Sequence, residues 1–133
     1  MFPNLQWKLT NENRVIAGFN CRKAVAVIFD SVYVFAFSPD EIMIPVGPCS
    51  INGLPRMILG VTIPRIFTSW IATKVMLTSV NESAIKPLSV KKPYTLISLK
   101  NIIDERTKDW YGRGDNANDV KQQKARFQWL TLL

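Results

Sequence analysis

The sequence predicts an α+β or mainly β fold, in which a small antiparallel sheet or barrel-like core precedes C-terminal helices. Period-2 alternation and runs of β-branched and aromatic residues gather in the first half of the chain. Proline and glycine punctuate the middle, and helical spacing of apolar residues occurs only in the last third. Strands first and helices last, without regular βαβ alternation, argue against a parallel doubly wound sheet.

The N-terminal segment predicts a β-hairpin. Leu5, Trp7 and Leu9 alternate with polar residues, which is typical of a half-buried strand near 5–10. Residues 11–13 (Asn-Glu-Asn) have turn chemistry, so the chain is expected to return as a second strand near 14–20. Gly18 inside that strand indicates a bulge or a close approach of the backbone.

Two apolar runs at the centre of the chain predict strands near 24–29 and 32–38. They lack alternation because both faces are apolar, so we expect strands that are covered on both sides and serve as a scaffold. Asp30 and Ser31 separate the runs. They predict a two-residue turn, with one long bent strand as the alternative.

The remaining elements follow from the spacing of prolines, glycines and apolar residues. A strand near 56–63, bent at Gly60, is expected within the proline-rich middle. Residues 62–80 fit both periodicities, and we favour a short helix near 64–72 followed by a strand near 73–80. Another strand is expected near 93–98. Helices are then expected near 99–111, capped by Ser98, and near 119–131.

Length and composition predict one folded domain over residues 1–133. Residues 1–63 form its mainly β part and residues 64–133 a mixed, more basic part. With 47% hydrophobic and 20% charged residues, the chain does not have the composition of a disordered protein. Residues 1–66 carry six basic and four acidic side chains, whereas residues 67–133 carry eleven basic and six acidic ones. Cys21 and Cys49 are expected to be free thiols, with a disulfide as the alternative.

The residue types argue against enzymatic function. The 133 residues include no histidine, which excludes serine–histidine triads and histidine-bound metals within the chain. No glycine-rich phosphate loop is present, and the adjacent acids Asp40–Glu41 and Asp104–Glu105 do not face a common site. The chain is therefore predicted not to be an enzyme. We expect no catalytic residue, cofactor, metal or small-molecule substrate.

A net charge of +7 raises nucleic-acid binding as an alternative function. In the C-terminal half, basic residues lie near aromatic ones, and this combination suits phosphate neutralisation and base stacking. The candidate contacts are Lys86, Lys91, Lys92, Lys100, Lys121, Lys124 and Arg126.

The function that the sequence favours is a non-catalytic structural or interaction subunit of a larger assembly, for example a viral capsid or tail component. Apolar residues extend to both ends of the chain, and the candidate interface residues are Phe2, Trp7, Trp129, Leu132 and Leu133. The expected partners are other protein subunits, in a homo- or hetero-oligomer. No secretory signal is visible, so synthesis in the cytoplasm and incorporation into a virion are expected. The apolar runs fall short of the roughly 20 residues that membrane insertion needs.

Overall fold

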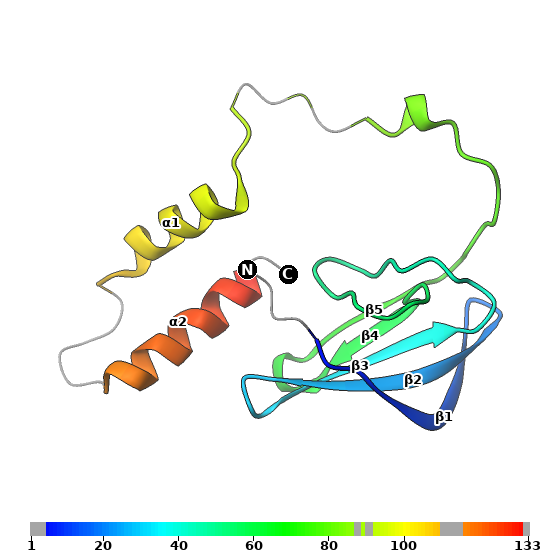
Figure 1. Ribbon diagram of the computed structural model, residues 1–133, viewed down its shortest axis with the longest axis horizontal. Helices are drawn as coiled ribbons and strands as arrows, with labels where there is room; N and C mark the ends of the chain where they lie inside the picture. The colour runs from blue at the N-terminus through cyan, green and yellow to red at the C-terminus, as the bar shows by residue number, and fades with distance from the viewer. Residues whose placement is uncertain (1–4, 87–88, 90–91, 110–115, 132–133) are drawn as a thin grey trace. The chain divides into compact units, whose positions relative to one another are not determined.

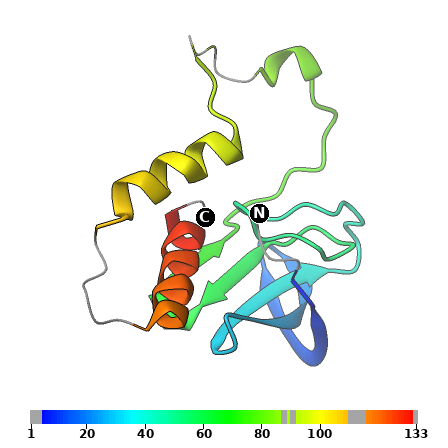
Figure 2. The ribbon, with the colours of Figure 1, turned by 60° about the vertical axis from the view of Figure 1, so that its left-hand side comes forward.

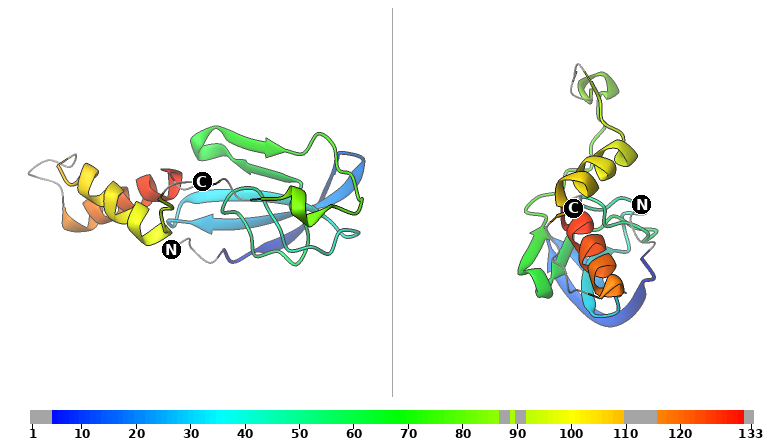
Figure 3. Two further views of the ribbon diagram at one scale, coloured as in Figure 1. Left: turned by 90° about the horizontal axis from the view of Figure 1, so that it is seen from above. Right: turned by 90° about the vertical axis from the view of Figure 1, so that its left-hand side faces the viewer.

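The computed structural model describes residues 5–86, 89, 92–109 and 116–131. Within these residues, five strands form one antiparallel sheet in the order β1-β2-β3-β4-β5 (Figure 1). The strands are β1 (Lys8–Ile16), β2 (Phe19–Ile28), β3 (Val32–Pro39), β4 (Gly60–Ile63) and β5 (Thr68–Ile71). Each strand pairs with the next along the chain, a meander that can be followed in Figure 3. The predicted α+β class, an antiparallel sheet followed by helices, is confirmed.

The chain divides into two compact units. The first, Met1–Val75 with Trp129–Leu133, contains the whole sheet. The second, Met76–Gln128, contains the short 3-10 helix η2 (Glu82–Ala84), α1 (Leu96–Thr107) and most of α2 (Ala117–Thr131), all visible in Figure 2. The helix expected near 119–131 is confirmed by α2. Among the described residues, no helix combines the length and the apolar character that crossing a bilayer requires.

The first hairpin turns later than the sequence predicts. The prediction of a turn at residues 11–13 is wrong, because β1 continues through these residues, where it forms a bulge, and runs to Ile16. The chain turns instead at Ala17 and Gly18, whose φ angles of 51° and 84° are those of a two-residue hairpin turn. The residues before and after this turn, Ile16 and Phe19, pair directly. Gly18 therefore supplies a positive φ rather than a bulge, and a Cβ there would meet nothing within 4 Å.

The turn between β2 and β3 has three residues, Phe29–Ser31, and not the expected two. Ile28 pairs with Val32, and the Ser31 amide donates to the Ile28 carbonyl at 3.3 Å. Phe29 and Asp30 adopt φ angles of 49° and 59°, a left-handed conformation that costs about 1–2 kcal/mol per residue without glycine. Phe29 also packs against the main core cluster, and this burial offsets the strain.

The main core lies on one face of the sheet. It contains alternate residues of β2, β3 and β4 together with apolar residues from the long β3–β4 connection. Its buried members are Leu5, Ala24, Ala26, Ile28, Val32, Val34, Ala36, Ile51, Leu54, Ile58, Val61 and Ile63. Within the connection, the Ile58 amide donates a backbone hydrogen bond to the Val46 carbonyl at 2.8 Å. Ile51, Leu54 and Ile58 of this connection are buried in the main core.

A second, smaller cluster lies at the β1–β2 hairpin end of the sheet. Its buried members are Ile16, Cys21, Phe37 and Leu59. Gly60 allows the close packing, because a Cβ at this position would lie 2.8 Å from the Ile16 Cδ1 atom.

Cys21 and Cys49 are both free thiols, buried and exposed respectively. Desolvation by burial is the main reason why the pKa of Cys21 is raised above its ordinary value of 9.0.

Three predictions for residues 56–80 need correction. The strand expected near 56–63 is confined to β4, residues 60–63. The helix expected near 64–72 is wrong: Pro64 opens only the 3-10 turn η1 (Pro64–Ile66), which ends at Phe67 with φ 51°. The β-branched residues beyond it pair with β4 as β5, because ladder pairing outcompetes weak helix propensity. The strand expected near 73–80 is also wrong, since these described residues form no helix or strand.

The prediction for residues 93–111 placed the start of the helix too late. The strand expected near 93–98 is wrong, because α1 already begins at Leu96. Thr95, and not Ser98, is the N-cap, and its Oγ1 accepts a hydrogen bond from the Ser98 amide at 3.1 Å. The helix ends at Thr107, short of the predicted 111, and residues 110–111 lie outside the described residues.

Candidate functional site

The two faces of β2 and β3 are not equivalent. One face belongs to the main core, whereas Val27 and Tyr33 on the other face are 47% and 53% exposed. The expectation that both central runs are covered on both sides is therefore wrong. Val25 pairs with Phe35 and Val27 with Tyr33, so the four side chains are direct cross-strand neighbours on one face. We call these four residues the open-face patch.

Two aromatic rings form the centre of the open-face patch. Tyr33 and Phe35 are separated by one residue on β3 and so project from the same face. Their ring centroids lie 6.3 Å apart and their planes differ by 23°. Nearly parallel rings at this spacing present a shared aromatic surface.

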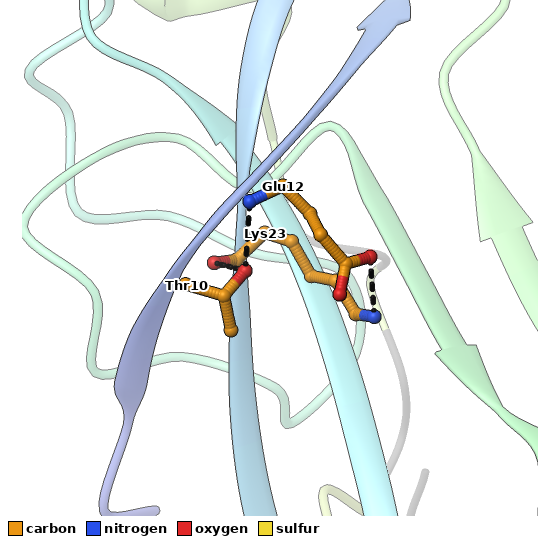
Figure 4. Close-up of polar contacts among 3 residues, drawn as sticks. All are labelled: Thr10, Glu12 and Lys23. Carbon is orange, nitrogen blue, oxygen red and sulfur yellow. Dashed lines mark hydrogen bonds and ion pairs between the residues drawn. The ribbon is translucent and has the colours of Figure 1, made fainter.

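A β-bulge in β1 lies beside Lys23 of β2, whose ammonium group contacts this aromatic surface. Leu9 pairs with Ala24 but Asn13 pairs with Arg22, so β1 holds two extra residues between these pairs. The bulge is held by the Thr10 hydroxyl, which donates to the Lys23 carbonyl at 3.2 Å and accepts from the Glu12 amide at 3.2 Å (Figure 4).

The bulge brings the Glu12 carboxylate to the Lys23 ammonium. The Lys23 Nζ donates to Glu12 Oε2 at 2.8 Å, as Figure 4 shows, and lies 4.6 Å from the centroid of the Phe35 ring. The Lys23 side chain is largely covered, whereas that of Glu12 faces solvent. Glu12 is thus a positioning residue, because it holds a lysine against the ring by charge and hydrogen bonding.

A second cation–aromatic contact marks the edge of the exposed surface. The Arg14 guanidinium carbon lies 5.8 Å from the centroid of the Phe37 ring. Phe37 is two residues beyond Phe35 on β3 and belongs to the smaller core cluster. This face of the sheet is therefore covered at the β1–β2 hairpin end and exposed at the β2–β3 turn end.

A hollow of about 460 Å³ adjoins the aromatic pair. It is lined by Ser31, Tyr33, Phe35, Pro64 and Arg65. The β4–β5 connection contributes Pro64 and Arg65, because β4 pairs with β3 and the η1 turn follows its last residue. We call this space the Arg65 hollow. Arg65 is exposed and forms no ion pair with the described part of the chain.

Positive charge predominates around the patch. Lys8 pairs with Val25 and shares its face, and Arg14, Lys23 and Arg65 complete a group of four cations. Two acids lie near this group. Glu12 is paired with Lys23, and Asp30 is exposed in the β2–β3 turn. Such a surface combines ring faces for stacking with side chains that bind anions.

The basic residues predicted as nucleic-acid contacts lie on several segments of the second unit. Lys86 and Lys92 are exposed outside helices, Lys100 is exposed on α1, and Lys91 lies outside the described residues. On α2, Lys121 is exposed, whereas Lys124 and Arg126 are half-buried. Arg126 lines a shallow hollow of about 210 Å³ together with the acidic Asp119 and two glutamines.

The predicted interface residues are placed only in part. Trp7 is half-buried against the main core, and its Nε1 donates to the Asn52 carbonyl at 2.8 Å. Trp129 lies on α2. Phe2, Leu132 and Leu133 lie outside the described residues.

Sequence reasoning missed the open-face patch. A signal was present, because Val32, Val34 and Ala36 occupy one parity of β3 while Tyr33, Phe35 and Phe37 occupy the other. Small aliphatic residues on one face and aromatic residues on the other distinguish the two faces of the strand, even though all six residues are apolar.

Comparisons with protein families, curated proteins and solved structures yield no match to this chain. The described residues contain no group of three or more side chains suited to holding a metal ion. The candidate site is therefore defined by its own geometry, which offers aromatic surface and positive charge.

Proposed function

We propose that this protein binds single-stranded nucleic acid on the open face of its sheet. The observation that carries the proposal is the nearly parallel Tyr33–Phe35 pair, exposed at Tyr33 and adjoined by Lys23 and Arg65. Stacking of a base on an aromatic side chain contributes about 1–3 kcal/mol and tolerates any base, because every base has a π-face.

A single strand fits this surface better than a duplex. The rings project from a sheet face, and bases inside a duplex cannot leave their stack to reach them without unpairing. Unpaired bases can lie flat on the rings while the backbone follows the surrounding cations. The proposal moves the contact surface from the C-terminal half, where the charge of the sequence suggested it, to the sheet.

The cations set the expected dependence on salt. Phosphate contacts release counterions, so the logarithm of the association constant falls linearly with the logarithm of salt concentration, by about 0.7 per phosphate for single strands. Four cations border the patch, and contact by all four would give a slope of about −3.

The test is to measure the affinity for a labelled oligonucleotide of about ten nucleotides by fluorescence anisotropy at two salt concentrations. Tyr33→Ala is expected to weaken binding roughly tenfold, because it removes one stacking surface. Tyr94→Ala is the matched control, since Tyr94 is similarly exposed (63%) but lies before α1 in the other unit. Equal affinities for the two variants would refute the proposal, as would binding that is indifferent to salt.

We also propose a second function, as a non-catalytic subunit of a larger assembly such as a virion. The observation that favours it is the exposed apolar segment that contains Met43, Ile44 and Val46, in the long connection after β3. Such residues fit an interface with a second copy of the chain. Light scattering after size-exclusion chromatography tests this, with Ile44→Lys as the disrupting variant. A monomer for the unmodified chain at micromolar concentration would refute self-assembly.

A further inference from the structure

The Arg65 hollow combines three kinds of surface within one small space. Tyr33 and Phe35 supply aromatic rings, Pro64 an apolar wall, and Arg65 a positive charge. Its volume of about 460 Å³ lies in the range of about 300–1,000 Å³ that is usual for sites of small molecules. The space therefore suits a single planar group that carries an anion.

We infer that the Arg65 hollow holds one nucleotide of the bound strand, with its base against the Tyr33–Phe35 rings and its phosphate on Arg65. This inference rests on the proposed function and adds the unit of recognition to it. A nucleotide joins a planar base to an anionic phosphate, which matches the lining of the hollow. The guanidinium group is suited to the phosphate because its planar fork of donors can bind two oxygens at once.

The η1 turn fixes the place of Arg65 in advance. The ring of Pro64 restricts its φ angle, and the Phe67 amide donates to the Pro64 carbonyl at 3.0 Å. Ile66 packs against the main core, and its carbonyl accepts from the Thr68 hydroxyl at 2.9 Å. Arg65 thus lies between two anchored residues, which lowers the entropy that is lost when it binds a phosphate.

The charge of Arg65 is available for a ligand. Lys23 is paired with Glu12, and Arg14 lies over the Phe37 ring, whereas Arg65 makes no ion pair with the described residues. The phosphate is therefore expected on Arg65 rather than on Lys23, since binding to Lys23 would compete with an acid already in place.

The test is a titration of the isotopically labelled full chain, followed by the amide signals of Ser31, Tyr33 and Arg65 in NMR spectra. The probes are a nucleoside 5′-monophosphate, the corresponding nucleoside, inorganic phosphate, phosphotyrosine and an oligonucleotide of about ten residues. Arg65→Gln removes the charge and Arg65→Lys keeps it without the fork. Lys74→Gln is the control for loss of a cation elsewhere in the same unit.

The monophosphate is expected to shift all three signals at lower concentration than the nucleoside or phosphate alone. Arg65→Gln is expected to weaken the affinity for the monophosphate roughly tenfold, because a hydrogen bond to a charged group is lost. Lys74→Gln is expected to leave this affinity unchanged. If the oligonucleotide shifts the signals of Val27 and Tyr33 but Arg65→Gln binds as well as the unmodified chain, the inference fails and the proposed function stands. If neither nucleotide nor oligonucleotide shifts any signal of this face, both fail. Tighter binding of phosphotyrosine than of the nucleotide overturns the inference in favour of a phosphopeptide.

Discussion

The Nζ atom of Lys23 lies 4.6 Å from the centroid of the Phe35 ring while it donates to Glu12 Oε2 at 2.8 Å. Three groups from three strands thus meet on one face of the sheet: an acid from the β1 bulge, a cation from β2 and a ring from β3. The Glu12 carboxylate therefore offsets the Lys23 charge at the candidate site.

Replacement of Glu12 by Gln is expected to strengthen binding of single-stranded oligonucleotides about two- to threefold, because the Lys23 charge is no longer offset. The slope of affinity against salt should become steeper. Anisotropy titrations at several salt concentrations measure both effects. Lys23→Gln provides the opposite control, and a weaker affinity for Glu12→Gln would contradict the assigned role.

The Glu12–Lys23 pair is expected to add little to stability. Glu12 is mostly exposed, and ion pairs of this kind contribute about 0–1 kcal/mol. A double-mutant cycle with Glu12→Gln and Lys23→Gln, followed by urea unfolding, should give a coupling energy below about 1 kcal/mol. A coupling energy of several kcal/mol would show that the bulge is held together mainly by this pair.

Adjacent residues of β3 should differ sharply in their effect on stability. Val34 is fully buried in the main core, so Val34→Ala is expected to lower the free energy of unfolding by about 2 kcal/mol. Tyr33→Ala, on the half-exposed open face, removes the ring contact with Phe35 and should lower it by about 0.5–1 kcal/mol. Urea denaturation monitored by tryptophan fluorescence measures both. Similar losses at the two positions would mean that the open face is covered.

The Ala17–Gly18 turn offers a matched pair of substitutions. Ala17 has a φ of 51°, a strained angle for any residue with a Cβ, so Ala17→Gly is expected to raise stability by about 0.5–1 kcal/mol. Gly18→Ala places a Cβ at φ 84° and should lower stability by about 1–2 kcal/mol. Thermal unfolding of the two variants tests the turn, and the opposite signs distinguish it from a turn at residues 11–13.

Cys21 predicts a pH dependence at the alkaline end. Burial raises the pKa of the folded thiol above 9.0, its ordinary value in the unfolded chain. Above pH 9 the unfolded chain releases the proton first, so stability is present below that pH and falls as pH rises toward the folded pKa. Cys21→Ala should flatten this fall in urea unfolding between pH 8.5 and 10.

Cys49, being exposed, should react with a thiol reagent in the native state, whereas Cys21 should react only after unfolding. Rapid reaction of both thiols would exclude a buried Cys21.

Sequence patterns predicted the class of the fold and β3, but not the bounds of the first two strands. The strands expected near 5–10, 14–20 and 24–29 are instead β1 (Lys8–Ile16) and β2 (Phe19–Ile28), so the strand expected near 14–20 is wrong. The β-branched and aromatic residues of Val32–Phe37 favoured a strand, and β3 lies within one residue of the predicted 32–38. Local hydrogen bonds determined the bounds and types of elements that the hydrophobic pattern did not predict. The Thr10 hydroxyl holds residues 10–12 as a bulge where turn chemistry suggested a reversal, and Thr95 starts a helix where a strand near 93–98 was expected.

The sequence analysis did not predict the candidate site, although the two parities of β3 differ in their residue types. Hydrophobicity alone does not distinguish an aromatic side chain that fills a core from one that lies on an exposed face. Tyr33 belongs to the second kind only because the β3–β4 connection, through Ile51, Leu54 and Ile58, covers the opposite face of the sheet. The position of that long connection depends on tertiary packing.

The residues inserted at the β1 bulge contribute to the surface of the sheet, and the pairing register of β1 with β2 does not require them. Leu9 pairs with Ala24 and Asn13 with Arg22, so removal of two residues between Leu9 and Asn13 would restore one continuous register. Because side chains on a strand alternate with a period of two, such a deletion would turn no residue of β1 to the opposite face. Deletion of Asn11 together with Glu12 would therefore remove the acid beside Lys23, while the pairing that supports the hydrophobic core keeps its register.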